Sequence, residues 1–206
     1  MHTLILIAAI LLSIDLAAAQ TKDEWRKLFD GKTLAGWKSA NFGGEGEVRV
    51  ENGQLILEMG NNMTGVTWTG GDLPLVDYEI RLEAMKVDGN DFFCGLTFPV
   101  RDSYCSLIIG GWGGGIVGLS SLDGEDASEN ETTKIMGFKK GQWYRIRLRV
   151  TGERIEAWID DASIVNVATA GRRISIRPEV ELSKPLGIAT WITKAALRNI
   201  ELRKLK

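Results

Sequence analysis

Histidine is almost absent from this sequence of 206 residues, in which the only one is His2. If the chain is cut before Gln20, as argued below, the remaining protein contains no histidine. That absence would exclude Ser-His-Asp and Cys-His catalysis, histidine-zinc sites and any imidazole base. Proton transfer would then depend on Asp, Glu, Lys, Tyr or water.

The chain also lacks a strong excess of one charge. It has 25 Lys and Arg against 27 Asp and Glu, which gives a formal net charge of −2. Such a balance argues against nucleic acid or an anionic membrane as the main partner. Hydrophobic residues make up 44% of the chain, which excludes a disordered protein.

The apolar run Leu4–Leu12 is too short to span a bilayer, which requires about 20 residues. Three alanines, 17 to 19, follow it and fit the small-residue site at which a signal peptide is cut. We therefore expect residues 1–19 to be a signal peptide, residues 20–206 to form one domain, and the protein to be secreted or periplasmic. The alternative is a short N-terminal anchor or packed helix, because the first residues include no Lys or Arg.

Cys94 and Cys105 are the only cysteines. Residues 92–98 and 103–109 are both typical of strands, and residues 99–102 between them are typical of a turn. In such a hairpin the two cysteines would lie nearly opposite each other, which predicts a disulfide in an oxidising compartment. The alternative is a pair of small buried thiols.

Strict alternation of apolar and polar residues dominates the rest of the chain. Residues 144–150 show it clearly, with Arg145, Arg147 and Arg149 on the polar face, where Glu156 or Asp160 could pair with them. Asn52-Gly53 between two alternating runs predicts a tight hairpin turn. About ten to twelve short strands with regular turns predict an all-β fold, an antiparallel sandwich or barrel.

Residues 110–137 form the least regular segment, which is first glycine-rich and then acidic. Its carboxylates include Asp123, Glu125 and Asp126, which could bind a divalent cation such as calcium through oxygen atoms. They do not match the EF-hand pattern, and a solvated acidic loop is the alternative. The glycine run lacks the Lys-Ser/Thr ending of a phosphate-binding loop.

Several segments carry a resemblance to a known family. They are Leu28–Trp37 (LFDGKTLAGW), Asp77–Glu83, Gly141–Ile146, Trp158–Asp161 and Leu197–Ile200. Together they resemble the 3-keto-disaccharide hydrolase domain, over nearly all of the chain after the leader. The resemblance implies a concanavalin A-like jelly roll in which a curved sheet presents a sugar-sized cleft on its concave face. It also implies cleavage of a glycosidic bond in sugars oxidised to a ketone at C3.

The chain departs from this family at positions of the cleft. Many members carry a Glu and a Gln on a central strand, and alignment places them at Cys105 and Leu107. Many also carry an arginine at the end of the preceding strand, which is absent here unless Arg101 replaces it. The sequence therefore belongs to a divergent branch, whose catalytic residues do not transfer directly.

The implied chemistry needs one base near the C2 proton and an electrophile near the C3 oxygen. Asp91, at the entry of the central hairpin, is the candidate base, with an acid between Asp123 and Glu131 as the alternative. Arg101 is the candidate for stabilising the enolate. Arg198 lies among apolar positions of the last strand, which predicts a structural ion pair.

Tryptophan is abundant, with seven residues, and an indole ring suits the apolar face of a pyranose. Trp68, Trp112 and Trp191 are the candidate sugar-stacking residues, and Thr97 is a further candidate for substrate binding. The alternative for Trp68 and Trp191 is a place in the sandwich core, and for Trp112 it is a lid that packs onto the sheet. The most favoured function is cleavage of 3-keto glycosides. The alternative is a non-catalytic glycan-binding module on the same fold.

Overall fold

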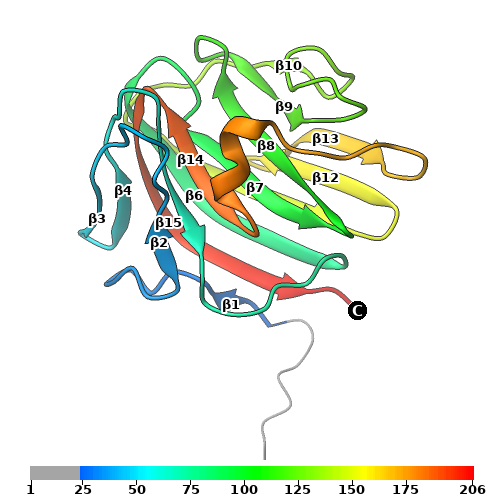
Figure 1. Cartoon of the computed structure of the whole chain (residues 1–206), viewed down its shortest axis with the longest axis horizontal. Helices are drawn as coiled ribbons and strands as arrows, with labels where there is room; N and C mark the ends of the chain where they lie inside the picture. The colour runs from blue at the N-terminus through cyan, green and yellow to red at the C-terminus, as the bar shows by residue number, and fades with distance from the viewer. Residues whose placement is uncertain (1–23) are drawn as a thin grey trace, which may run out of the picture.

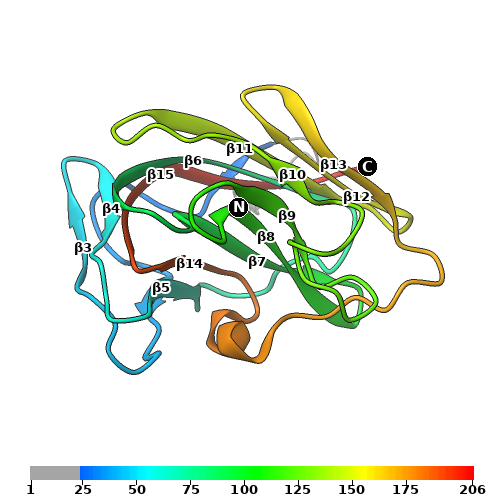
Figure 2. The same cartoon turned by 90° about the horizontal axis from the view of Figure 1, so that it is seen from above.

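The computed structural model describes residues 24–206, and the predicted signal peptide lies outside these residues. Two antiparallel sheets face each other in two layers (Figure 2), which confirms the predicted β-sandwich. The first sheet contains, in spatial order, β13 (Ala162–Ala168), β12 (Arg154–Ile159), β11 (Trp143–Val150), β6 (Tyr78–Gly89), β15 (Thr193–Lys204), β4 (Gln54–Leu57) and β3 (Val48–Glu51), and β1 (Arg26–Lys27) pairs with β15. The second contains β10 (Lys134–Ile135), β9 (Ile116–Ser120), β8 (Ser103–Gly111), β7 (Cys94–Val100), β14 (Gly187–Trp191), β5 (Met63–Trp68) and β2 (Trp37–Ser39).

Alternation along each strand creates the core between the sheets. In β11, the even-numbered residues from Tyr144 to Val150 are buried, whereas Arg145, Arg147 and Arg149 lie on the outer face. Fully burying such an apolar side chain contributes about 1.5–3 kcal/mol. The predicted pairs across the next hairpin are present, since Arg149 lies 3.6 Å from Glu156 and Arg145 lies 3.7 Å from Asp160.

Turn chemistry fixes the register of the hairpins. Asn52 and Gly53 have φ angles of +50° and +78°, as the predicted tight turn between β3 and β4 requires. The β7–β8 turn contains only Arg101 and Asp102, because Val100 already pairs with Ser103.

This register corrects the disulfide prediction. Cys94 lies opposite Ile109, and Cys105 lies opposite Phe98. The two cysteines are therefore four residues apart along the strands, or about 13 Å, whereas a disulfide needs Cα atoms within about 7 Å. Both are free, fully buried thiols, and burial raises the pKa of each to about 12.

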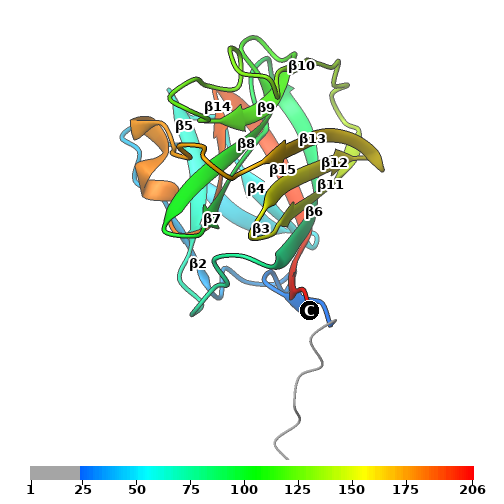
Figure 3. The ribbon, with the colours of Figure 1, turned by 90° about the vertical axis from the view of Figure 1, so that its right-hand side faces the viewer.

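A short 3-10 helix, η1 (Pro178–Ser183), lies across the outer face of the second sheet (Figures 1 and 3). We call residues 177–183 the strap. The Thr67 hydroxyl of β5 donates to the Leu182 carbonyl over 2.5 Å. A Cβ on Gly187 of β14 would lie 2.5 Å from the Ser183 carbonyl oxygen, so the strap packs this closely only against glycine.

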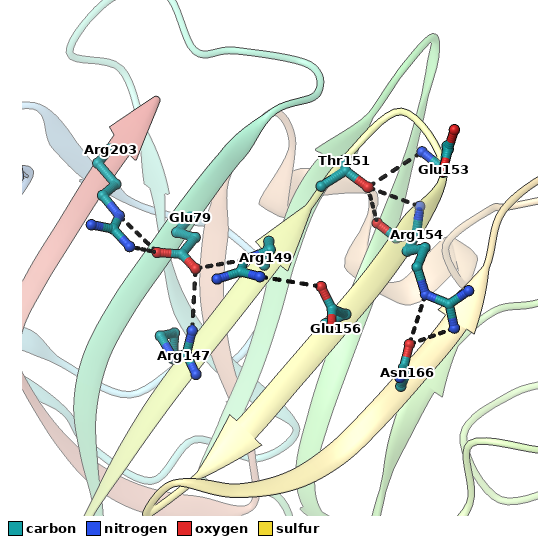
Figure 4. A network of polar contacts seen from close by, with 9 residues as sticks. All are labelled: Glu79, Arg147, Arg149, Thr151, Glu153, Arg154, Glu156, Asn166 and Arg203. Carbon is teal, nitrogen blue, oxygen red and sulfur yellow. Dashed lines mark hydrogen bonds and ion pairs between the residues drawn. The ribbon is translucent and has the colours of Figure 1, made fainter. Parts of the chain in front are cut away.

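The outer face of the first sheet carries a dense charge network (Figure 4). Glu79 of β6 is fully buried beneath Arg147, Arg149 and Arg203, whose guanidinium nitrogens lie 2.5–3.2 Å from its carboxylate. Arg147 also stacks on the Trp158 ring, 3.7 Å from its centroid. The charges of this cluster are therefore paired with one another across neighbouring strands.

Candidate functional site

The outer face of the second sheet has a floor of small and hydroxyl side chains. Thr97, Ser106 and Ser120 are cross-strand neighbours on β7, β8 and β9, and the Thr97 and Ser106 hydroxyls are hydrogen-bonded over 2.8 Å. Ser120 Oγ is buried without a hydrogen-bond partner. Gly65 and Ala189 continue the floor on β5 and β14. Small side chains on a central face leave space above the sheet.

One pocket occupies that space, and a second adjoins it beside Asp91 and Trp191. The inner pocket has a volume of ≈ 250 Å³ and is lined by Met63, Asp91, Phe92, Ser106, Ile108, Trp112, Ser120, Arg177, Glu179, Val180 and Trp191. The outer pocket has a volume of ≈ 490 Å³ and is lined by Met59, Asp88, Gly89, Asn90, Asp91, Gly113, Lys140, Trp191 and Ile192. Asp91 and Trp191 belong to both.

Asp91 follows the turn that leaves β6 and is held by backbone groups. Its own N–H donates to Thr193 Oγ1 over 3.1 Å, and its carboxylate accepts the N–H groups of Phe92 (2.8 Å) and Gly113 (2.9 Å). An ionised carboxylate has about four lone-pair sites. Asp91 therefore anchors the glycine-rich loop and still has acceptor capacity toward the pockets.

Trp112 and Trp191 are brought together at the pockets, and Trp68 is not. Trp112 sits at the tip of the glycine-rich loop with φ +49° and 43% of its surface exposed. Trp68 is buried in the core, where its ring meets the edge of Trp37 at a centroid distance of 5.3 Å. Thr97 is also buried, directly beside Ser106 in the floor.

Arg101 lies at the opposite end of the β7–β8 hairpin from Asp91. It forms the turn with φ +56°, and its guanidinium donates to the Gly152 carbonyl. A strand of seven residues places the two ends about 20 Å apart. The structure therefore does not bring the predicted base and the predicted electrophile together.

The guanidinium at the inner pocket belongs instead to Arg177, which the sequence analysis did not select. Its Nη1 lies 2.7 Å from Asp126 Oδ2, and its Nη2 lies 3.0 Å from Glu179 Oε1. The hydrogen bond from Arg177 lowers the pKa of Glu179. Burial would raise the pKa of Asp126, but hydrogen bonds from Ser128 and the charge of Arg177 lower it overall. The only signal for Arg177 in the sequence is the charged segment Arg177-Pro178-Glu179, which lies in a region without alternation of apolar and polar residues.

The acidic loop does not supply the predicted cation ligands as a set. Asp123 lies 2.6 Å from Arg172 and accepts the Arg173 N–H over 2.7 Å, Asp126 pairs with Arg177, and Glu125 is exposed. Within residues 24–206, no three side chains of the metal-binding types converge on one point. These residues do not fit a divalent cation, because arginines already neutralise two of the three carboxylates.

The structure also corrects the alignment of the central strand. Cys105 and Leu107 of β8 face the core and are fully buried, whereas Ser106 and Ile108 line the inner pocket. The cleft positions of this strand are therefore one residue away from those predicted. Alternation along this strand could have indicated which side chains face the core, since Cys105, Leu107 and Ile109 form its apolar face.

The sequence matches the model of the 3-keto-alpha-glucoside-1,2-lyase-like domain over residues 24–203. The chain belongs to this family. Its members are carbohydrate-active domains of the glycosyl hydrolase type, so the observed cleft lies in a family that acts on sugars. None of the curated proteins matches the sequence. Among the described residues, no helix has the length and apolar character needed to cross a membrane.

Solved structures share the fold of this lyase-like domain at low sequence identity. A glycosyl hydrolase-like protein of Parabacteroides distasonis superposes with a TM-score of 0.58 at 13% identity, covering 88% of this chain and 94% of its own. A carbohydrate-binding module of Bacillus subtilis gives 0.51 at 13% identity, covering 82% and 96%. Domain 4 of an arabinanase of Geobacillus stearothermophilus, solved with arabinotriose, gives 0.52 at 12% identity, covering 82% of each chain.

Proposed function

We propose that this protein cleaves the glycosidic bond of 3-keto glycosides by base-assisted elimination. The observation that carries the proposal is the composition of the inner pocket, in which the Asp91 carboxylate and the Arg177 guanidinium share one space with Trp112 and Trp191. The membership of the lyase-like family supports the same reaction class. The leader-like residues 1–19 support a role outside the cytoplasm.

Each residue has a role in this scheme. Asp91 removes the C2 proton, and the electron pair of the C2–H bond forms an enolate on the C3 ketone. The enolate then expels the C1 substituent, whose oxygen takes up a proton, and water adds later to the C1–C2 double bond. Arg177 has five N–H donors, of which Asp126 and Glu179 use three, and the others stabilise the enolate oxygen. The two tryptophans hold the ring.

The direct test is incubation with 3-keto-trehalose and 3-keto glucosides while the released sugar or aglycone is measured. Asp91→Asn should lower kcat at least 100-fold, as expected for loss of a general base. Its melting temperature should fall only modestly, because the amide oxygen can still accept one of the two backbone N–H groups that the carboxylate accepts. Asp102→Asn, an exposed change in the β7–β8 turn, is the matched control. Asp91 is not the base if its variant turns over like the parent.

A non-catalytic glycan-binding module is the second candidate. It is favoured by the pairing of Arg177 with two carboxylates, which offset the positive charge that would stabilise an enolate. Solved carbohydrate-binding modules also share this fold. Sugar binding without turnover of any 3-keto glycoside would select this function.

A further inference from the structure

We infer that the site takes neutral glycosides end-on, with the terminal 3-keto ring in the inner pocket and its C1 substituent in the outer pocket. This inference rests on the proposed function, because it assigns the two ends of a sugar ligand. It places the bond to be broken between Asp91 and Trp191, the two residues that line both pockets.

The strap closes the far side of the inner pocket. Arg177, Glu179 and Val180 line this pocket, and η1 packs against Gly187 at one end of β14. Asp91 lies toward the other end of this strand, where the Trp191 N–H donates to the carbonyl of the neighbouring Phe92. The strap is fixed on the sheet by the Thr67 hydrogen bond and by its close packing against Gly187. A sugar chain that entered past Asp91 would therefore end at this wall instead of continuing along the sheet.

The size of the inner pocket agrees with a single ring. Its volume of ≈ 250 Å³ is about half that of the outer pocket, ≈ 490 Å³, which suits a single ring at the closed end. The floor beneath it supplies the Ser106 and Ser120 hydroxyls, and Ser120 Oγ has no protein partner. One ring can thus be held between a hydroxyl floor and the indole of Trp112.

The outer pocket carries the features of a second contact surface. Met59 and Ile192 line it and are 40% and 44% exposed, which is unusual for large apolar side chains of one small region. Lys140 and Asp88 form an ion pair of 2.7 Å on its rim. This pocket therefore offers apolar contact with polar groups at its edge, as the faces and hydroxyls of a second ring require.

The charges around the inner pocket balance one another. The positive charge of Arg177 is offset by Asp126 and Glu179, and the buried Lys86 interacts with the charge of Asp91. The pocket therefore offers no unpaired charge to an ionised sugar, which suits a neutral terminal ring.

Three probes test the orientation: methyl 3-keto-glucoside in both anomers, 3-keto-trehalose, and a trisaccharide whose middle ring is the 3-keto ring. If the parent protein turns the probes over, kcat/KM is compared, and if it does not, calorimetric dissociation constants are compared instead. We expect the trisaccharide to be at least 100-fold poorer than 3-keto-trehalose. Equal use of the two would overturn the end-on arrangement.

Two exposed residues separate the pockets, since Trp112 lines only the inner one and Met59 only the outer one. Trp112→Ala should lower kcat/KM, or raise the dissociation constant, at least tenfold for both the methyl glycoside and 3-keto-trehalose. Met59→Ala should lower the preference for 3-keto-trehalose over the methyl glycoside about fivefold. Leu75→Ala is the control and should change neither the values for the two probes nor the preference between them. Leu75 is exposed, and its carbonyl accepts the Arg101 N–H at the far end of the hairpin.

The outcomes keep the two proposals apart. Binding in this pattern without cleavage overturns only the proposed reaction, and cleavage with equal effects of Met59→Ala on both probes overturns only the end-on arrangement. Failure of the parent protein to bind or cleave any probe would overturn both.

Discussion

Asp91 combines an anchoring contact with the chemical role proposed for it. Its carboxylate ties Gly113 to the end of β6, and this contact fixes the loop that presents Trp112. A Cβ on Gly114 would lie 2.9 Å from the Asn90 carbonyl oxygen, so the same loop also depends on glycine for its close approach. The proposed base and one of the proposed stacking rings are therefore positioned by a single short hydrogen-bonded unit.

The two cysteines give a direct test of the strand register. Because Cys94 and Cys105 are buried, with the pKa of each raised to about 12, native protein should not react with a thiol reagent at pH 8. In denaturant without reductant, two thiols per chain should react. A reduced sample gives the reference value. Finding no reactive thiol in the unreduced, denatured protein would show that a disulfide forms after all.

The sequence predicted the strands of this hairpin but not its register. Alternation identifies residues that face the core, whereas the length of the turn decides which residues lie opposite each other. Arg101 has a positive φ angle that most residues avoid, so a two-residue turn at this position was not evident. This error led to the disulfide prediction, whereas Arg101 was selected as a replacement for the arginine of the resembling family.

On the first sheet, the Glu79 cluster joins three neighbouring strands (Figure 4). Glu79 of β6 pairs with Arg147 and Arg149 of β11 and with Arg203 of β15. Burial would raise the pKa of Glu79, but hydrogen bonds from Arg149 and Arg203 outweigh it and lower the pKa. The predicted structural pairing of Arg198 is confirmed in the same sheet, where it lies 2.6 Å from Glu83.

Replacing Glu79 should reveal how much this cluster contributes. Glu79→Gln leaves three partly buried guanidinium groups without their carboxylate, which should lower the free energy of unfolding by about 3 kcal/mol. Urea denaturation of parent and variant at pH 7 measures the difference. Glu51→Gln removes an exposed partner of Arg49 and should cost less than about 1 kcal/mol. Similar losses in the two variants would contradict a special role for Glu79.

The strap and the acidic loop form a unit that sequence reasoning could not assemble. Arg172 and Arg177 lie 41 to 51 positions from the carboxylates of the acidic loop that they bind. The carboxylates by themselves suggested a cation site, because nothing local in the sequence indicates that arginines fill it. As a result, the wall of the inner pocket, including Arg177, was missed, while Asp91, Trp112 and Trp191 were found from local signals.

For the molecule as a whole, the sandwich was predictable because alternation and turn residues recur along the entire chain. The site was less predictable, since its parts come from the β6–β7 turn, the glycine-rich loop and the strap, which meet only after the sheets have formed. Each sheet uses its outer face differently. The first carries paired charges around a pocket that Arg147 and Trp158 help to line, whereas the second has small side chains beneath the inner pocket.

The distribution of titratable groups predicts how stability depends on pH. Hydrogen bonds and charges of Arg or Lys partners lower the pKa of several carboxyls in the folded protein, among them Glu58, Asp123, Glu131 and Glu179. The unfolded chain therefore binds more protons as the pH falls through about 4, and stability is lost in that range. In contrast, residues 24–206 contain no histidine, the side chain that ordinarily titrates between pH 5 and 8.

Stability should consequently be constant between about pH 5.5 and 8 and fall on both sides. On the alkaline side, the thiols ionise in the unfolded chain from about pH 8.5, whereas burial keeps them protonated in the folded protein up to about pH 12. Folding then binds protons, so stability decreases as the pH rises. Urea midpoints measured from pH 3 to 10 test this profile, and 1 M salt should flatten its acidic limb by screening the exposed pairs. A change of more than about 1 kcal/mol between pH 5.5 and 8 would contradict the assignment, because no side chain of the described residues has its ordinary pKa in that interval.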